Sequence, residues 1–222
     1  MPVDKVSKEK EPIAAAERVE VKSKSTFREY AEAIGMALLL ALFIRTFIVQ
    51  AFKIPSGSMI PTLLIGDHIL VNKLAYGVRV PFLEQYVLDF QKPRRGDVVV
   101  FIFPEDRSKD FIKRVIAVGG ETVEIRAKKV YVNGVPIEDP HAHFEGSEFP
   151  GSAVANQDDY GPRTVPENHI FVMGDNRDRS HDSRFWGFVN TDDVKGKAFL
   201  IYWSWDGTDR WVRWERIGNV IY

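Results

Sequence analysis

The chain has 222 residues, a length typical of one domain with an appendage. Its formal net charge is −1, so it lacks the basic excess expected of a nucleic-acid-binding protein. A mean hydropathy of −0.19 excludes a multi-pass membrane protein but permits a single span. There is no cysteine, which excludes disulfides, thiolate metal sites and a cysteine nucleophile.

The N-terminal part changes from polar to apolar at Ala33. Residues 1–32 are charged and polar, which predicts a mobile tail. Residues 33–52 are apolar apart from a few positions, Arg45 being the one charge, and as a helix they would be about 30 Å long. We interpret them as a retained transmembrane helix, with a buried core helix and a cleavable signal sequence as alternatives. Because Lys and Arg precede the span, the tail is expected in the cytoplasm and residues 53–222 outside.

Residues 53–222 carry short segments rich in Val, Ile and Phe, which predict β-strands. Glycine-containing pairs separate several of these segments, and VYVNGVPI is typical of a hairpin with an Asn-Gly turn. No helical segment of 10–15 residues lies between them, so we expect a mainly antiparallel β domain. Residues 134–168 are polar and rich in Gly and Pro, which predicts a long excursion or a small inserted subdomain. The expected strands are His68–Asn72, Asp97–Phe103, Phe111–Val118, Thr122–Ile125, Lys129–Val132, His169–Met173 and Lys197–Trp203.

A serine in a compact turn is the first candidate for chemistry. Pro55-Ser56-Gly57-Ser58 follows the apolar segment, and such a turn can present a hydroxyl together with backbone N–H groups. Lys113 is a candidate base, because it stands in the apolar strand FIKRVI, where burial lowers a lysine pKa. Each residue alone has a plainer interpretation, as a surface loop and as an edge-strand lysine.

Histidines offer weaker alternatives. His181-Asp182 suggests a Ser-His-Asp triad, although no G-x-S-x-G sequence is present. His141 and His143 suggest a metal site, but no third ligand follows at a convincing spacing. The segment Gly174–Arg184 has no apolar side chain, and its dense Asp, Arg and Ser fit either a solvated loop or a hydrogen-bonded network beside an active site.

These blocks together resemble bacterial type I signal peptidase. The resemblance rests on four segments that follow the apolar helix in order, and it covers roughly residues 33–202. The segments are FKIPSGSMIPTLLIGDHILVNK, RRGDVVVFIFP, DFIKRVIAVGGETV and GDNRDRSHDSRFWG. The length is similar to that of the single-span members. The resemblance implies a barrel-like antiparallel β-sheet with a small inserted β subdomain at about residues 134–168, preceded by one transmembrane helix.

The resemblance also implies a role for individual residues. Ser58 would be the nucleophile and Lys113 the general base, and the oxyanion hole would combine the Ser58 backbone N–H with the Ser56 hydroxyl. Ser180 would orient the lysine amine. The residues expected to support this network are Asp175, Asp182 and Arg184, and those expected to bind small substrate side chains are Phe52, Ile54, Met59, Leu63 and Ile112.

The implied function is removal of signal peptides from exported preproteins at small-x-small sites, at the outer face of the cytoplasmic membrane. No metal or cofactor is required. The expected partners are signal peptides leaving the export machinery and the lipid bilayer, with no nucleic acid, and a monomer is expected. A membrane-anchored scaffold and a repressor-type Ser/Lys autoprotease are the alternative functions. Four of the five tryptophans lie between residues 203 and 214, which fits either core packing or contact with the membrane interface.

Overall fold

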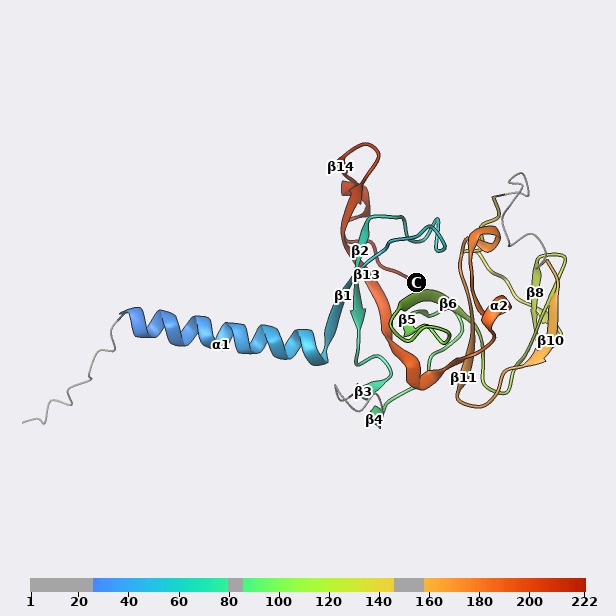
Figure 1. Cartoon of the computed structure of the whole chain (residues 1–222), viewed down its shortest axis with the longest axis horizontal. Coiled ribbons are helices and arrows are strands. Elements are labelled where there is room, and N and C mark those ends of the chain that lie inside the picture. The colour runs from blue at the N-terminus through green and yellow to red at the C-terminus, as the bar shows by residue number, and fades with distance from the viewer. Residues whose placement is uncertain (1–25, 80–85, 146–157) are drawn as a thin grey trace, which may run out of the picture. The chain divides into compact units, whose positions relative to one another are not determined.

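The computed structural model describes residues 26–79, 86–145 and 158–222. The chain divides into two compact units, Met1–Leu39 and Leu40–Tyr222. Most of the predicted N-terminal tail therefore lies outside the described residues. Figure 1 traces the elements along the chain.

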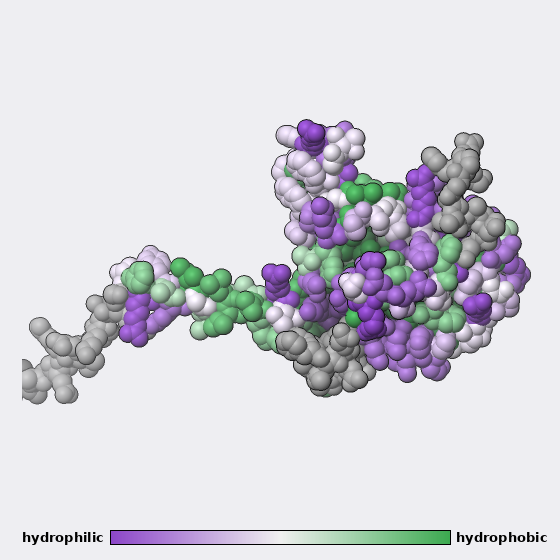
Figure 2. All heavy atoms as spheres, viewed as in Figure 1, coloured by the Kyte–Doolittle hydropathy of each residue, from purple (hydrophilic) through white to green (hydrophobic). Residues whose placement is uncertain are grey.

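Helix α1 spans Thr26–Phe47 and is long and apolar enough to cross a membrane. Its 22 residues give a length of about 33 Å. None of its residues is buried, and Figure 2 shows apolar side chains along its surface. The absence of buried positions favours a membrane span over the alternative of a core helix.

Both ends of the predicted span differ from those of the helix. The helix begins at Thr26 instead of residue 33. Near its start, Arg28 and Glu32, one turn apart, form an ion pair of 2.8 Å. It ends at Phe47, and Val49–Lys53 form strand β1. Residues 49–52 pair with β2 (Asp67–Asn72), so ladder hydrogen bonds from a distant segment override the helical interpretation.

A large, mainly antiparallel sheet carries the remaining unit, and Figure 1 shows it curling on itself. Within the described residues it has eight strands. In spatial order they are β1, β2, β13 (Val194–Asp206), β5 (Val98–Ile102), β6 (Asp110–Val118), β11 (His169–Met173) and β12 (Val189–Asn190), while β14 (Trp211–Val212) pairs with β13. The prediction of a mainly antiparallel β fold is confirmed.

The buried apolar residues of this unit form three clusters. All five residues of β5 are buried, as expected for a strand covered on both faces. One cluster, which includes Ile54, Met59 and Leu63, lies under the turn that connects β1 to β2. The turn that carries Ser58 is therefore anchored in the core by the residues beside it.

A second, four-stranded sheet lies in the predicted region of insertion. Its order is β10 (Tyr160–Thr164), β7 (Thr122–Arg126), β8 (Lys129–Val132) and β9 (Val135–Pro136). Asn133 and Gly134 both have positive φ, at 53° and 76°, so the Asn-Gly hairpin is confirmed. Two of the four strands precede residue 134, so the sheet begins earlier than the expected insertion. Strands β3 (Gly77–Arg79) and β4 (Tyr86–Asp89) form a separate pair.

Short helical turns complete the fold. They are η1 (Arg177–Arg179), α2 (Ser183–Trp186), η2 (Thr191–Asp193) and η3 (Trp214–Arg216). The first two belong to the polar segment Gly174–Arg184, which follows β11.

Candidate active site

The Ser58 hydroxyl and the Lys113 amine meet in the structure. Ser58 stands in the turn between β1 and β2, and Lys113 stands in the middle of β6, opposite Val99 of β5. Lys113 Nζ donates a hydrogen bond of 2.5 Å to Ser58 Oγ. Residues 55 positions apart in the sequence are thus brought into direct contact by the fold.

The lysine amine is buried, and this changes its acidity. Lys113 is 3% exposed, and burial lowers its pKa from the usual 10.5 to about 8. The carboxylates of Asp182 and Asp175 oppose this shift, and the Arg184 guanidinium adds to it. At pH 7 about one amine in ten is then neutral, compared with about one in 3,000 at the ordinary pKa. A neutral amine hydrogen-bonded to a hydroxyl can remove the hydroxyl proton.

A cavity of about 510 Å³ opens beside this pair. It is lined by Ser56, Gly57, Ser58, Ile60, Ile65, Phe111, Lys113, Glu145, Asn176, Arg179 and His181. Ser56 is an exposed residue of the same turn and lines the cavity, and its place in an oxyanion hole stays a prediction. Its lining combines apolar side chains with charged and amide side chains.

Two buried ion pairs organise the segment Gly174–Arg184. Arg114 binds both carboxylate oxygens of Asp175, at 2.8 and 2.7 Å, and Thr62 donates to the same carboxylate at 2.5 Å. Arg184 binds both oxygens of Asp182, at 2.8 and 2.9 Å. Paired, buried and bidentate contacts of this kind hold a loop in one conformation.

Asp182 also fixes the start of the polar segment. Its carboxylate accepts hydrogen bonds from the backbone N–H groups of Gly174 and Arg184, the second as a cap of α2. The three residues expected to support the network therefore lie together around Lys113. Their contact with the lysine is electrostatic.

Ser180 is the residue expected to orient the lysine amine. It is fully buried, but within the described residues its hydroxyl has no hydrogen-bond partner, and the lysine amine contacts Ser58 instead. A buried hydroxyl without a hydrogen-bond partner is energetically costly, so its position calls for an explanation. Its lysine-orienting role remains a prediction. The Cβ of any other residue at position 174 would overlap the Ser180 side chain and the Ser58 carbonyl, so Gly174 allows these two segments to approach.

The residues expected to bind substrate share one core cluster. Ile54, Met59 and Leu63 are buried in one core cluster, and Phe52 and Ile112 pack against it. None of the five is among the residues that line the cavity itself. Their substrate-binding role stays a prediction. The apolar part of the cavity lining is supplied by Ile60, Ile65 and Phe111.

The histidines make no comparable arrangement. His181 lines the cavity, but its ring packs edge-on against Trp186, with centroids 4.9 Å apart. The Ser58 hydroxyl instead accepts a hydrogen bond from Lys113. Among the described residues no group of three His, Cys, Asp or Glu side chains is placed to hold a metal ion. His143 joins the site through its backbone, forming a bridge with Asn176.

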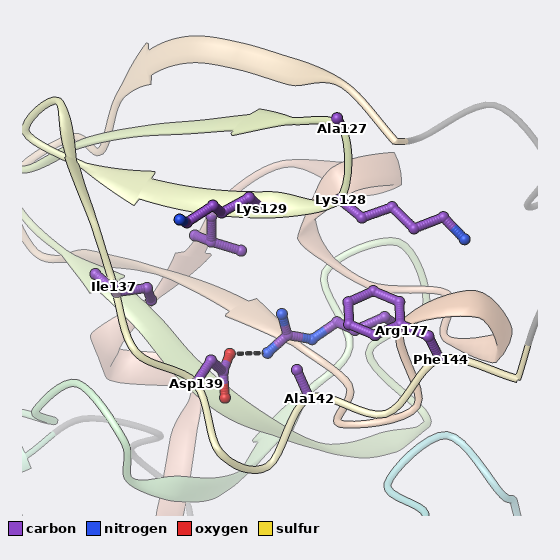
Figure 3. Close-up of a pocket in the computed structure, with 9 residues that line it drawn as sticks. Ala127, Lys128, Lys129, Ile137, Asp139, Ala142, Phe144 and Arg177 are labelled. Atoms are coloured by element: carbon purple, nitrogen blue, oxygen red, sulfur yellow. Dashed lines mark hydrogen bonds and ion pairs between the residues drawn. The ribbon is translucent and has the colours of Figure 1, made fainter.

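Arg177 links the small sheet region to the polar segment. Its guanidinium binds the Gly174 carbonyl at 3.1 Å and the Asp139 carboxylate. Figure 3 shows this contact across a second cavity, of about 320 Å³, that lies below the β7–β8 turn. Residues from the predicted insertion therefore reach the loop that surrounds the lysine.

Several residues of the site were not singled out by sequence reasoning. Arg114 carried a usable signal, because it is a second cation in a core strand and needs a buried anion. Asn176 lay inside the polar segment without a distinguishing feature. Glu145 had no signal, because its contact depends on how the insertion folds back.

Comparisons with known proteins identify the family of this chain. The family model described as signal peptidase, peptidase S26 matches residues 27–203. A signal peptidase I of Pseudomonas aeruginosa is 38% identical over 207 residues, covering 80% of this chain and 72% of that protein. One of Aquifex aeolicus is 38% identical over 223 residues, covering 76% and 81%. A solved signal peptidase I of Enterococcus faecalis is 34% identical, with a TM-score of 0.40 over 49% of this chain and 98% of its own.

The β fold, the apolar N-terminal helix and the matching relatives fit a membrane-anchored hydrolase. The chain belongs to the signal peptidase S26 family, and it is a serine endopeptidase of the signal peptidase I type. This membership favours the enzyme over the non-catalytic scaffold.

Proposed function

We propose that this enzyme removes N-terminal signal peptides from exported preproteins at small-x-small sites, with Ser58 as nucleophile and Lys113 as general base. The observation that carries the proposal is the hydrogen bond of 2.5 Å from a buried lysine amine to a serine hydroxyl in a cavity. The matching relatives carry the name signal peptidase I, and their similarity covers most of this chain.

The mechanism follows from the protonation state of Lys113. The neutral amine takes the Ser58 proton as the hydroxyl oxygen attacks the scissile carbonyl, and the oxyanion is met by the Ser58 N–H and the Ser56 hydroxyl. The resulting ammonium gives its proton to the leaving amine, and an acyl-enzyme remains. The regenerated neutral amine then activates a water molecule that hydrolyses the ester.

Substrate selection is assigned to the apolar side of the site. We assign the binding of small side chains such as alanine to Phe52, Ile54, Met59, Leu63 and Ile112. They pack as one apolar cluster, in which Phe52 and Ile112 are the partly buried members. Bulky substrate side chains would have to displace these residues, which costs about 1–3 kcal/mol each. The proposed substrate requirement is therefore a small residue at the two positions that contact this cluster.

Placement in the membrane completes the proposal. Helix α1 would span the cytoplasmic membrane with the N-terminus inside, and the catalytic unit would act on the outer side on signal peptides leaving the export machinery. The enzyme would act as a monomer at the lipid surface, without a metal, a cofactor or nucleic acid.

The test is cleavage of a preprotein with an Ala-x-Ala site, in detergent, by the wild type, Ser58→Ala and Lys113→Ala. We expect wild-type cleavage at that site, a loss of about 10³-fold or more in each variant, and a wild-type kcat/KM that rises with pH up to a pKa of about 8. Activity lost in Ser58→Ala but retained in Lys113→Ala would overturn the base. A folded wild type that cleaves no such preprotein would overturn the substrate class.

A further inference from the structure

The peptide unit between Gly57 and Ser58 carries the backbone N–H assigned to the oxyanion hole. This unit is trans, since the cis bonds of the described chain lie at Ile60-Pro61 and Gly161-Pro162. In a planar trans peptide the carbonyl and the N–H point in opposite directions. Any group that holds the Gly57 carbonyl therefore also aims the Ser58 N–H.

Asn176 holds the backbone on both sides of the nucleophile. Its side-chain Nδ2 donates to the Gly57 carbonyl at 3.3 Å, and its backbone N–H donates to the Ser58 carbonyl at 3.1 Å. Asn176 is 1% exposed, so water does not compete for these contacts. One buried residue thus fixes two successive peptide planes of the turn.

Glu145 in turn holds the amide of Asn176. Its Oε1 accepts from Asn176 Nδ2 at 2.7 Å, while its Oε2 accepts from Arg179 Nε at 2.7 Å. The two partners of Nδ2 are both acceptors, so the amide has a single favourable orientation. Among the residues that the structure describes, its buried Oδ1 has no hydrogen-bond partner, a cost that a residue kept only for packing would not carry.

We propose that Asn176 and Glu145 are positioning residues of the oxyanion hole: Glu145 fixes the Asn176 amide, and Asn176 fixes the Gly57–Ser58 peptide so that its N–H faces the cavity. The role rests on the proposed function, because it needs Ser58 to be the nucleophile. It assigns a catalytic consequence to the predicted insertion, from which Glu145 comes. Removing an oxyanion donor costs about 10²–10³-fold in kcat, and misdirecting one should cost less.

The variants separate the steps of this chain of contacts. Asn176→Ala removes the side-chain hydrogen bond to the Gly57 carbonyl, and Asn176→Asp keeps the shape of the side chain but replaces the donor with an acceptor. Glu145→Ala removes the support of the amide, and Glu145→Gln keeps an acceptor for it. Glu124→Ala is the matched control, because Glu124 pairs with Arg126 at a side-chain exposure of 21%, close to the 23% of Glu145, and lies on the small sheet.

The readouts are kcat, KM and inhibition of the full chain in detergent. One inhibitor is an Ala-x-Ala peptide aldehyde: the Ser58 oxygen bonds to its carbonyl carbon, the carbonyl π electrons move to the oxygen, and the hydroxyl proton passes to Lys113. The other is the corresponding peptide alcohol, which has no carbonyl to attack. The aldehyde reports on the oxyanion donors, and the alcohol reports on binding alone.

We expect Asn176→Ala to lower kcat by about 10–10²-fold with KM within about twofold, and Asn176→Asp to lose at least as much. The inhibition constant of the aldehyde should rise by the same factor as kcat falls, and that of the alcohol should stay unchanged. Glu145→Ala should show the same pattern at about 3–10-fold, Glu145→Gln should recover most of the loss, and Glu124→Ala should match the wild type.

Equal weakening of aldehyde and alcohol, or a raised KM with unchanged kcat, would overturn the positioning role. If neither Asn176 variant folds, the pair Glu145→Ala and Glu145→Gln decides, since Glu145 is partly exposed; wild-type kcat in both would refute the proposal. A wild type that cleaves no preprotein would overturn the proposed function, and the positioning role with it. That failure is seen in the wild type alone, so the two failures are distinguishable.

Discussion

Replacing the buried lysine with methionine should stabilise the protein while removing its activity. Methionine has nearly the length of the lysine stem and carries no charge. The site lowers the Lys113 pKa from 10.5 to about 8, and at 1.36 kcal/mol per pH unit this amounts to about 3 kcal/mol. At pH 7 the charged amine weakens the fold by that amount, so Lys113→Met should raise the free energy of unfolding by up to about 3 kcal/mol.

The sign of the pH dependence follows from proton binding. Between pH 8 and 10.5 the unfolded chain holds a proton on this lysine that the native chain has released. Wild-type stability contributed by Lys113 therefore increases with pH across this window and is complete above it. The variant lacks this increase, so its advantage at pH 7 should disappear as the pH approaches 10.5.

Urea unfolding in detergent at pH 7 and pH 10, followed by tryptophan fluorescence, measures both effects. Lys195→Met is the control, because Lys195 is not buried and forms a surface ion pair with Asp110. It should give no gain at either pH. A Lys113→Met variant that is less stable than the wild type at pH 7, or equally favoured at both pH values, would refute the reasoning.

Three further changes test other parts of the structure. Gly174→Ala should destabilise the fold by about 1–3 kcal/mol and lower kcat, because its methyl group would overlap Ser180 and the Ser58 carbonyl; an unchanged urea midpoint would contradict the close approach. His181→Ala should retain cleavage within about tenfold, since Lys113 holds the nucleophile, whereas a loss of 10³-fold would restore the histidine triad. Trp211→Ala should weaken binding of a chain without α1 to phospholipid vesicles several-fold, because Trp211 is 66% exposed. Val135→Ala, at 63% exposure, is the control, and equal binding by the two variants would exclude a membrane contact of Trp211.

Local patterns predicted those elements that local interactions determine. The bounds of β8 and β11 coincide with the expected strands, and the Asn-Gly turn has the expected positive φ values. The end of α1 was not predictable in this way, because residues 49–52 suit a helix and a strand equally well. Their pairing with β2 decides between the two, and a partner 17 or more residues away leaves no mark on the local sequence.

The same distinction between local and long-range interactions applies to the residues of the site. Lys113 stood out because a lysine in an apolar strand is unusual, and its contact with Ser58 is now seen in the structure. The pairing of Asp175 with Arg114 joins residues 61 positions apart and needs the register of β6 against its neighbours. The role of Glu145 could not be predicted from the sequence, because nothing local distinguishes it from the other acidic residues of its polar stretch.

The neighbouring cations of β6 make the accuracy of strand pairing a condition for catalysis. Lys113 lies opposite Val99, and Arg114 lies opposite Val98. A slip of one residue would exchange the faces of the two side chains and bring the guanidinium to the serine. Arginine does not lose its proton in proteins, so a misregistered molecule would keep a positive charge beside Ser58 and still lack a base. A one-residue register error in this hairpin would therefore yield inert protein instead of an enzyme with altered specificity.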